Sequence, residues 1–342
     1  MKAIWTTRRG RPEVLEVREG SIPEPGPGEV RIAVRAAGLN FAEVAARQGL
    51  YPDAPPLPAV LGYELAGTID ALGEGVETHA RGARVAALMR FGAHASHVCV
   101  PAAQAFPIPE AMPFEEGAAL PVNYVTAYHM LFRIRRLQPG ETVLVHMAAG
   151  GVGTAALQLC RSVPDVRVIG TCSKGKHEYA REQGCDHPID YRSVDYVEEV
   201  RRITEGRGVD LVLDALGGAD WAKGYSLLRS TGTLIAFGWA NMIKPGRRRI
   251  LHVLGQLARL RRYSPMTLMG DNRAIAGVNL GHLWHEAEMI QEECEALIRL
   301  YEAGVIRPRI DRSFSFEEAA QAHHHLEGAK NLGKIVLIPE PE

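Results

Sequence analysis

Short apolar runs alternate with glycine- and proline-rich turns over about the first 121 residues. A turn cluster at Pro23–Gly28 leads into Glu29–Val34, where apolar and polar residues alternate with the period of two that is typical of a strand. Further strands are expected at Glu64–Ile69, Ala83–Leu88 and His97–Pro101. The pattern therefore predicts an all-β or β-rich domain.

The pattern changes near Pro121, after which continuous apolar runs of strand length are separated by helical patterns. Strands without alternation are typical of a parallel sheet that helices cover on both faces. The expected strands are Thr142–His146, Val166–Thr171, Val209–Asp214, Thr233–Phe237 and Ala274–Leu280. The expected helices are Val152–Ser162, Lys176–Gln183, Tyr196–Thr204 and Ala222–Leu228. The last segment predicts helices at Glu286–Glu302 and Phe316–Glu327 and a strand at Lys334–Ile338.

Composition limits the classes of protein that the chain can belong to. Its 342 residues suffice for about two domains. The net charge of −1 argues against general nucleic-acid binding. The five cysteines lie far apart without a C-x-x-C pair, which is typical of a reducing compartment. Because no signal-peptide pattern and no membrane-length apolar run is present, we expect a cytoplasmic location.

A loop of small residues follows the first strand expected in the parallel sheet. Its spacing is Ala148-x-Gly150-x-x-Gly153, in which alanine replaces the first glycine of the dinucleotide fingerprint. Gly150 would let the backbone approach a pyrophosphate, and the following helix would offer free N–H groups to it. A tight turn without a ligand is the alternative for this loop taken alone. The residues expected to cradle the pyrophosphate are Ala149, Gly150, Gly151, Val152 and Gly153.

The second strand expected in this sheet ends in the sequence GTCSKGK, Gly170–Lys176. It lacks the carboxylate that usually binds the ribose hydroxyl of NAD, and the next acidic residue, Glu178, falls inside a predicted helix. A hydroxyl and two lysines suit a 2′-phosphate instead, with ordinary solvated lysines as the alternative. We therefore predict NADPH as the cofactor, with Ser173, Lys174 and Lys176 around its phosphate.

Several longer motifs point to one family. They are PEPGPGEVRIAVRAAGLNFAEVAARQGLYP, LPAVLGYELAG, VNYVTAYHML, VLVHMAAGGVG and NLGKIVLIP. In combination they resemble the medium-chain dehydrogenase/reductase superfamily, and within it the zinc-free quinone oxidoreductase branch. The VAT-1 type is the most similar, through VNYVTAY, HMAAGGVG, HPIDYRSVDYV, DALGG and AKGYSLL.

The resemblance implies an α/β protein with two domains and several further residues near the cofactor. A GroES-like catalytic domain would comprise residues 1–121 and 282–342, and a doubly wound Rossmann domain would comprise residues 122–281 and pair through its sheet edge in a homodimer. Thr126 would lie beside the nicotinamide and Tyr191 near the adenosine phosphate. The remaining cofactor residues would be Gly238, Asn241, Asn331 and Lys334.

The residues that bind zinc in metal-dependent relatives are replaced in this chain. Their Gly-His-Glu element is Gly62-Tyr63-Glu64 here, and the loop around Asn40 lacks the expected cysteine. Zinc needs three or four Cys, His or carboxylate ligands. His94 and His97 are expected on opposite faces of a strand, and the run His323–His325 is expected to be solvated on a helix. We therefore predict no bound metal.

Without a metal or an evident nucleophile, hydride transfer from the nicotinamide is the expected reaction. A quinone or an activated enone suits such a site, because hydrogen bonds suffice to stabilise the developing oxyanion. The resemblance places Asn40, Tyr51 and Tyr63 near the substrate, although asparagine often caps a turn and tyrosine often only packs. Ala45 stands where many quinone reductases of this branch have tyrosine, so the physiological substrate stays open.

The segment Lys244–Gly270 carries seven Lys or Arg and no acidic residue. Its apolar residues have helical spacing, which predicts a basic amphipathic helix. We expect the apolar face to pack against the protein itself, and peripheral membrane contact through residues 247–262 is the alternative. In that alternative the chain is an NADPH-binding interaction protein with little catalysis. The apolar residues are Ile250, Leu251, Val253, Leu254, Leu257 and Leu260.

Overall fold

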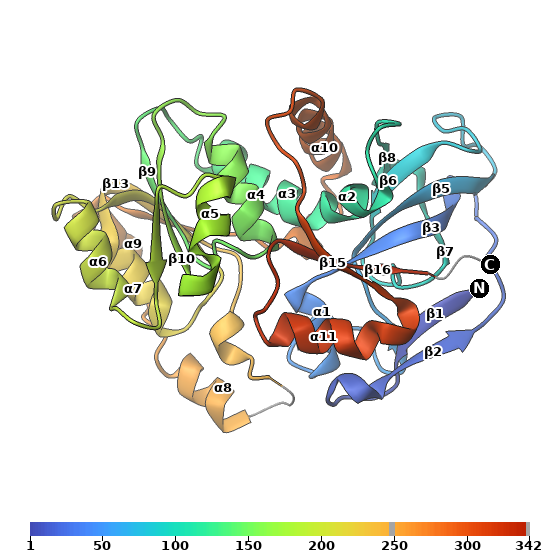
Figure 1. Cartoon of the computed structure of the whole chain (residues 1–342), viewed down its shortest axis with the longest axis horizontal. Coiled ribbons are helices and arrows are strands. Elements are labelled where there is room, and N and C mark those ends of the chain that lie inside the picture. The colour runs from blue at the N-terminus through green and yellow to red at the C-terminus, as the bar shows by residue number, and fades with distance from the viewer. Residues whose placement is uncertain (246–249, 340–342) are drawn as a thin grey trace. The chain divides into compact units, whose positions relative to one another are not determined.

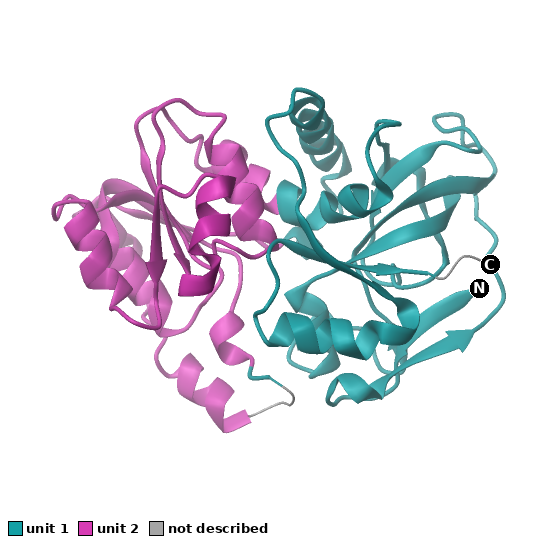
Figure 2. Cartoon of the chain, in the orientation of Figure 1, with its two compact units in different colours: residues 1–125, 244–248, 280–342 teal, residues 126–243, 249–279 magenta. Residues whose placement is uncertain are grey.

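The structure is a computed structural model that describes residues 1–245 and 250–339. The chain divides into two compact units, which Figure 2 shows in different colours. Unit 1 comprises Met1–Val125, Lys244–Arg248 and Leu280–Glu342, and unit 2 comprises Thr126–Ile243 and Arg249–Asn279. Both the N-terminal and the C-terminal parts of the chain therefore contribute to unit 1.

Unit 1 is built on a seven-stranded sheet around the long strand β3 (Glu29–Leu39) (Figure 1). Both neighbours of β3 on the main path, β16 and β5, run antiparallel to it. The other strands are β15 (Ile310–Ser315), β16 (Lys334–Ile338), β5 (Glu64–Leu72), β6 (Arg84–Leu88), β7 (His97–Pro101) and β8 (Ala105–Pro107). A second sheet of unit 1 joins β1 (Lys2–Thr6), β2 (Leu15–Glu19) and β4 (Ala59–Val60).

Alternating residues of β3 form the core of unit 1. Val30 and Ile32 are fully buried, and Ile32 lies opposite Ile69 of β5. They pack in one apolar cluster with Val85 and Val98 of the neighbouring strands. The alternation predicted at the start of this strand is thus confirmed.

Helices of different lengths complete unit 1. Sequence patterns did not indicate α1 (Phe41–Arg47) or α2 (Phe114–Ala119), because two turns of helix are too short to establish a period of 3.6 residues. The helix expected at Glu286–Glu302 is confirmed as α10 (Ala287–Glu302). The helix expected at Phe316–Glu327 begins with a 3₁₀ turn before α11 (Ala319–Glu327).

Unit 2 contains the predicted parallel sheet, in the order β11-β10-β9-β12-β13-β14. From β9 the chain winds outward first through β10 and β11 and then, on the other side, through β12 to β14, so the winding direction reverses between β9 and β12. The strands are β9 (Thr142–Val145), β10 (Arg167–Cys172), β11 (His187–Asp190), β12 (Val209–Asp214), β13 (Leu228–Ala236) and β14 (Ala274–Gly277). This doubly wound order, together with unit 1, confirms the predicted α/β fold class.

The helices of unit 2 also follow the expected positions, with small shifts at their ends. All six residues of β12 are buried, which explains the absence of alternation in its sequence. The helices between strands are α4 (Gly151–Cys160), α5 (His177–Gln183), α6 (Tyr196–Ile203) and α7 (Ala219–Leu227), followed by α8 (Ile250–Leu257) and α9 (Pro265–Asp271). α3 (Pro121–Tyr128) begins in unit 1 and ends in unit 2.

Gly67→Ala should destabilise the protein, because strand β5 leaves no room for a Cβ at this position. A Cβ on Gly67 would lie 2.2 Å from the carbonyl oxygen of Ala33 in β3. Forcing extra volume into such a contact costs about 1–3 kcal/mol of unfolding free energy, measurable by urea denaturation. Gly20→Ala is the matched control, since a Cβ there meets nothing within 4 Å. Equal unfolding free energies for the two variants would contradict the packing of β3 on β5.

Candidate active site

Asn40 lies at the end of β3, where the chain turns into α1. It is the N-cap residue of α1, and its backbone N–H donates to Glu43 Oε2 at 2.9 Å. This reciprocal cap satisfies a backbone donor that the first turn of a helix leaves free. The short helix α1 therefore fixes the backbone of Asn40.

The side chain of Asn40 joins a buried ion pair. Asn40 Nδ2 donates to Glu64 Oε1 at 2.8 Å, and the Lys334 ammonium donates both to Asn40 Oδ1 and to Glu64 Oε1. Glu64 Oε2 accepts the backbone N–H of Val122 at 2.6 Å. Glu64 begins β5 and Lys334 begins β16, so the two strands beside β3 bring these charges together.

Gly38 makes space for the Glu64 carboxylate. A Cβ on Gly38 would lie 2.5 Å from Glu64 Oε1. The carbonyl oxygen of Gly38 accepts a hydrogen bond from His94 Nε2, 3.1 Å away. Burial lowers the pKa of His94 to about 4, so its ring is neutral at neutral pH. The cluster therefore contains one ammonium and no charged histidine.

Glu43 is a second buried carboxyl in this cluster. It is fully buried, and its Oε1 has no hydrogen-bond partner within the described part of the chain. Burial raises the pKa of Glu43 to about 8, against the opposing effect of Lys334. At neutral pH Glu43 is therefore mostly protonated beside the charged Glu64–Lys334 pair.

The predicted tyrosines belong to an aromatic group in the same unit. The Tyr63 ring lies 6.2 Å from the Tyr51 ring and 4.8 Å from the Phe91 ring, measured between centroids. Burial first, and the nearby Tyr51 second, raise the pKa of Tyr63 far above its ordinary value. Tyr63 therefore keeps its proton and can act only as a neutral donor or as a wall of the site.

The glycine loop of unit 2 has the geometry of an anion cradle. Gly150 is the N-cap residue of α4, so the N–H groups of Gly151–Gly153 lie in its first turn, where an α-helix leaves them without an internal partner. No acidic residue in that turn offsets the positive end of the helix dipole. A Cβ on Gly153 would lie 2.3 Å from the carbonyl oxygen of Met147, so the loop passes close over the helix.

Ala148 fits this loop because the unusual backbone angle falls on its neighbour. Met147 has a φ of 54°, whereas Ala148 is not among the residues with positive φ. A Cβ on Gly170 of strand β10 would lie 2.8 Å from the Cβ of Ala148. Gly170 has no side chain and thus leaves room for the Cβ of Ala148. The loop can therefore carry alanine where the fingerprint has its first glycine.

Cationic residues gather at the carboxyl ends of β10 and β11. Cys172 pairs with Asp190 in the sheet, which brings the loop carrying Ser173, Lys174 and Lys176 next to the loop carrying Tyr191. Arg192, which the sequence analysis missed, places its guanidinium 5.7 Å from the centre of the Tyr191 ring. Its position directly after Tyr191 was the signal that could have identified it.

The other predicted cofactor residues have mixed surroundings. A Cβ on Gly238 would lie 2.8 Å from the carbonyl oxygen of Ala215, so this loop also requires glycine. Asn241 Nδ2 donates to the Gly217 carbonyl at 3.1 Å and to Asp220 Oδ2 at 2.7 Å, which ties together two loops of unit 2. Thr126 is buried in α3, and Asn331 is buried with its Nδ2 donating to the Gly333 carbonyl at 2.8 Å.

Known proteins match the chain over nearly its whole length. Residues 26–110 match the family described as alcohol dehydrogenase GroES-like domain, and residues 183–337 match the family described as zinc-binding dehydrogenase. The rat synaptic vesicle membrane protein VAT-1 homolog is 48% identical over 96% of this chain and 81% of its own length. The chain belongs to the medium-chain dehydrogenase/reductase superfamily.

Quinone oxidoreductases are further members of the superfamily that resemble the chain. The Pseudomonas aeruginosa quinone oxidoreductase is 35% identical over 99% of both chains. The crystal structure of Escherichia coli quinone oxidoreductase complexed with NADPH superposes with a TM-score of 0.87 at 30% identity, covering 99% of this chain and 100% of that one. These comparisons confirm the resemblance seen in the sequence motifs.

One matching family is described as zinc-binding, so we asked whether the atoms around Glu64 could bind zinc. In this member of the superfamily the Lys334 ammonium donates to both the Glu64 and the Asn40 oxygens, so a cation already occupies this carboxylate. An ammonium already neutralises the carboxylate, and the Asn40 amide is a poor zinc ligand beside it. The donor set therefore does not fit zinc. The described ranges 1–245 and 250–339 hold no group of three metal-binding His, Cys, Asp or Glu side chains.

The expectation that His323–His325 are solvated was wrong for His323. His323 is 2% exposed and lies beside the buried Arg47 guanidinium, because α11 turns this face toward α1. His325 is half-buried and pairs with Asp311 at 2.7 Å, and the more exposed His324 pairs with Glu13 at 2.7 Å. These histidines tie α11 to neighbouring segments of unit 1.

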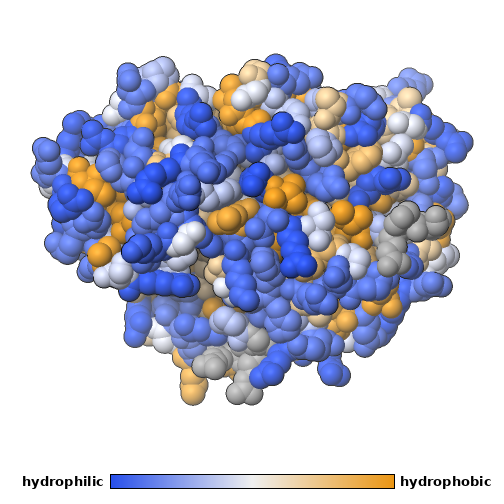
Figure 3. Space-filling model, in the orientation of Figure 1, coloured by the Kyte–Doolittle hydropathy of each residue, from blue (hydrophilic) through white to orange (hydrophobic). Residues whose placement is uncertain are grey.

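The expectation that the basic segment packs its apolar face inward was also wrong. Leu251 is 85% exposed, whereas His252 Nε2 donates to the Asn241 carbonyl oxygen, 2.6 Å away, and thus attaches α8 by a polar side chain. In Figure 3 hydrophobic atoms reach the surface at the lower edge, where Figure 1 places α8. Part of the segment, residues 246–249, lies outside the described residues, and α9 is a separate helix that begins at Pro265. The exposed residues of α8 are Ile250, Leu251, Leu254 and Leu257.

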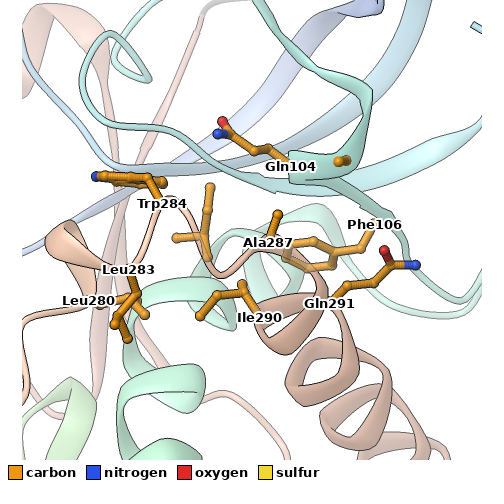
Figure 4. A pocket seen from close by; sticks show the side chains of 10 residues that line it. Gln104, Phe106, Leu280, Leu283, Trp284, Ala287, Ile290 and Gln291 are labelled. Atoms are coloured by element: carbon orange, nitrogen blue, oxygen red, sulfur yellow. The ribbon is translucent and has the colours of Figure 1, made fainter.

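An apolar pocket of unit 1 lies apart from the predicted residues. Figure 4 shows its side chains, which come from the segment around β8 and from the region where α10 begins. None of the predicted site residues lines it. The lining residues are Leu88, Ala103, Gln104, Phe106, Leu280, Leu283, Trp284, Ala287, Ile290 and Gln291.

Glu43→Gln should make the free energy of unfolding less sensitive to rising pH. In the folded protein the carboxyl of Glu43 has a pKa of about 8, against 4.5 in an exposed chain. The free energy of unfolding of wild type therefore decreases as pH rises between these two values. Glutamine keeps an acceptor for the Asn40 N–H and has no proton to lose. Urea unfolding at pH 5 and pH 8 should therefore show a larger decrease for wild type. Parallel decreases in both proteins would contradict the protonated state of Glu43.

Proposed function

We propose that the protein is an NADPH-dependent, zinc-independent oxidoreductase that transfers a hydride to a quinone or an α,β-unsaturated carbonyl. The observation that carries this proposal is the glycine cradle at α4, with a cluster of cations at the adjoining strand ends. The likeness to a quinone oxidoreductase complexed with NADPH supports it. NADPH, when bound, supplies the hydride.

The residues of unit 2 would bind the cofactor through backbone and charge. The pyrophosphate would meet the N–H groups of residues 149–153 at the positive end of α4. Ser173, Lys174, Lys176 and Arg192 would hold the 2′-phosphate, which needs cations rather than the carboxylate of NAD-specific proteins. Tyr191, which is 48% exposed, would lie against the adenosine. Thr126, Gly238, Asn241 and Asn331 stay predicted neighbours of the cofactor.

The residues of unit 1 would orient the hydride acceptor. Asn40 has one side-chain N–H that the Glu64 bond does not use, and this group can donate to a carbonyl oxygen. Tyr63 holds its proton firmly and offers a second neutral donor. Hydrogen bonds of this kind stabilise the negative charge that develops on the acceptor oxygen. Tyr51 would form the aromatic wall beside it.

The predicted homodimer would form through the edge of the unit 2 sheet. β14 is the terminal strand of that sheet, and its Ile275 is 37% exposed. An unpaired strand edge of this kind can extend a sheet into a second copy. We therefore propose pairing of two copies along β14.

The cofactor proposal predicts which side chains distinguish NADPH from NADH. Lys174→Ala/Lys176→Ala and Arg192→Ala should each raise the Kd of NADPH about tenfold or more, since a charge-assisted hydrogen bond contributes about 1.5–3 kcal/mol. The Kd of NADH should stay unchanged. Arg167→Ala, at the opposite end of β10, is the control. Fluorescence titration measures the affinity of each protein for NADPH and for NADH, and equal affinity of wild type for both nucleotides would refute the proposal.

Turnover itself needs a separate measurement. Wild type with NADPH should reduce members of a panel of quinones and enones well above the uncatalysed rate. Comparison of the two acceptor classes identifies the substrate class. A panel without any turnover would contradict the proposed function.

The exposed face of α8 favours a second candidate function, association with membranes. Four apolar side chains of α8 are exposed, and Arg259, Arg261 and Arg262 follow directly after it. An amphipathic helix with cations beside its apolar face suits an anionic lipid surface. The described residues contain no helix that is long and apolar enough to span a bilayer, so such contact would be peripheral. In this alternative the protein binds NADPH with little catalysis.

Leu251→Gln/Leu254→Gln should weaken binding to anionic lipid vesicles at least tenfold, because it removes two exposed apolar contacts. Met269→Gln, an exposed residue of α9 in the same unit, is the matched control and should bind like wild type. Vesicle co-sedimentation measures the partition. Failure of wild type to sediment with anionic vesicles would eliminate this candidate.

A further inference from the structure

We propose that Lys334 and Glu64 are positioning residues that fix the orientation of the Asn40 side-chain amide. The inference rests on the proposed function, in which Asn40 donates a hydrogen bond to the acceptor carbonyl. It changes the role of Lys334 from the predicted cofactor contact to a group that acts through Asn40.

The side chains of three neighbouring residues hold Asn40 at three of its polar atoms. Its backbone N–H donates to Glu43 Oε2, its Oδ1 accepts from the Lys334 ammonium, and its Nδ2 donates to Glu64 Oε1. Glu64 is fully buried and Lys334 is 3% exposed, so water does not compete for these contacts. Only one N–H of the amide is left for a further acceptor.

The opposite charges of Glu64 and Lys334 permit only one orientation of the Asn40 amide. With Oδ1 toward Lys334 and Nδ2 toward Glu64, each contact joins a donor to an acceptor. A rotation of the amide by 180° would set the NH₂ group against an ammonium and the oxygen against a carboxylate. Both contacts would then be repulsive in a buried site, where unpaired polar groups cost the most. The ion pair therefore determines where the remaining N–H points.

The location of the pair also favours a role beyond stability. A buried ion pair often contributes little net stability compared with apolar residues of similar size. This pair additionally requires Gly38, whose Cβ would lie 2.5 Å from Glu64 Oε1, and it uses the backbone N–H of Val122 to hold the other carboxylate oxygen. The Glu64 carboxylate is thus fixed at both oxygens, as a group that orients a neighbour must be.

The test uses the double variant Glu64→Gln/Lys334→Met, which removes both charges and leaves no unpaired buried ion. The new amide at position 64 offers a donor and an acceptor, so the Asn40 amide can adopt both orientations. We expect kcat/KM for the acceptor to fall at least tenfold, with the Kd of NADPH within twofold of wild type. In an Asn40→Ala background the same double change should cause no further loss. A further tenfold loss of kcat/KM in the Asn40→Ala background would overturn the proposal. A tenfold rise in the Kd of NADPH would also overturn it.

The matched control is Arg47→Met/Glu327→Gln, which removes another buried ion pair of unit 1. Its kcat/KM should stay within twofold of wild type, and a tenfold loss there would show that any buried pair has this effect. Hydrogen exchange of the Asn40 side-chain NH₂, assigned by comparison with Asn40→Ala in ¹⁵N spectra, gives a readout independent of activity. Slow exchange in wild type and fast exchange in Glu64→Gln/Lys334→Met are expected. If wild type shows no turnover, the proposed function fails, and equal exchange in both proteins would separately refute the positioning role.

Discussion

The buried contact between Glu64 and Lys334 constrains much of unit 1. A carboxylate that is wholly removed from water needs a cation and further hydrogen bonds, and the chain provides both. The antiparallel pairing of β5 and β16 with β3 brings the two charges to the same place. The glycine at position 38 gives the carboxylate space, and the side-chain amide of Asn40 gives it a donor. The order of these strands and the start of α1 are therefore part of one electrostatic arrangement.

The two units use different chemistry. In unit 2 the candidate ligand contacts are mainly backbone N–H groups and the dipole of α4, which require small residues rather than specific side chains. In unit 1 the candidate contacts are the side chains of Asn40 and Tyr63, and burial keeps Tyr63 protonated and the nearby His94 neutral. This division suits a protein in which a bound nucleotide supplies the reducing equivalents and the polypeptide orients the acceptor.

Local sequence patterns were sufficient for the parallel sheet and its helices. The continuous apolar run of β12 predicted a strand buried on both faces, and the glycine spacing predicted the start of α4. The same kind of reasoning could not assign Lys334, because its partners Asn40 and Glu64 lie about 270 to 294 residues away in the sequence. Only the pairing of β16 with β3 brings them together.

Two further features could not be predicted from the sequence for the same physical reason. Helical spacing in α8 identified an apolar face but not its direction, since the contacts of His252 decide which face meets the protein. Arg192 directly follows Tyr191 in the sequence, but only the register between β10 and β11 brings its loop next to the loop of Lys174. Periodicity determines which residues share a face, whereas tertiary contacts determine what that face meets.

We propose that the Lys334 ammonium neutralises the Glu64 carboxylate, so that this site works without a metal ion. Metal analysis of the purified protein, combined with the rate of NADPH oxidation after treatment with a strong zinc chelator, tests it most directly. We expect the protein to contain less than about a tenth of an equivalent of zinc and to keep an unchanged rate after chelation. Stoichiometric zinc, with a rate that the chelator abolishes and added zinc restores, would contradict it.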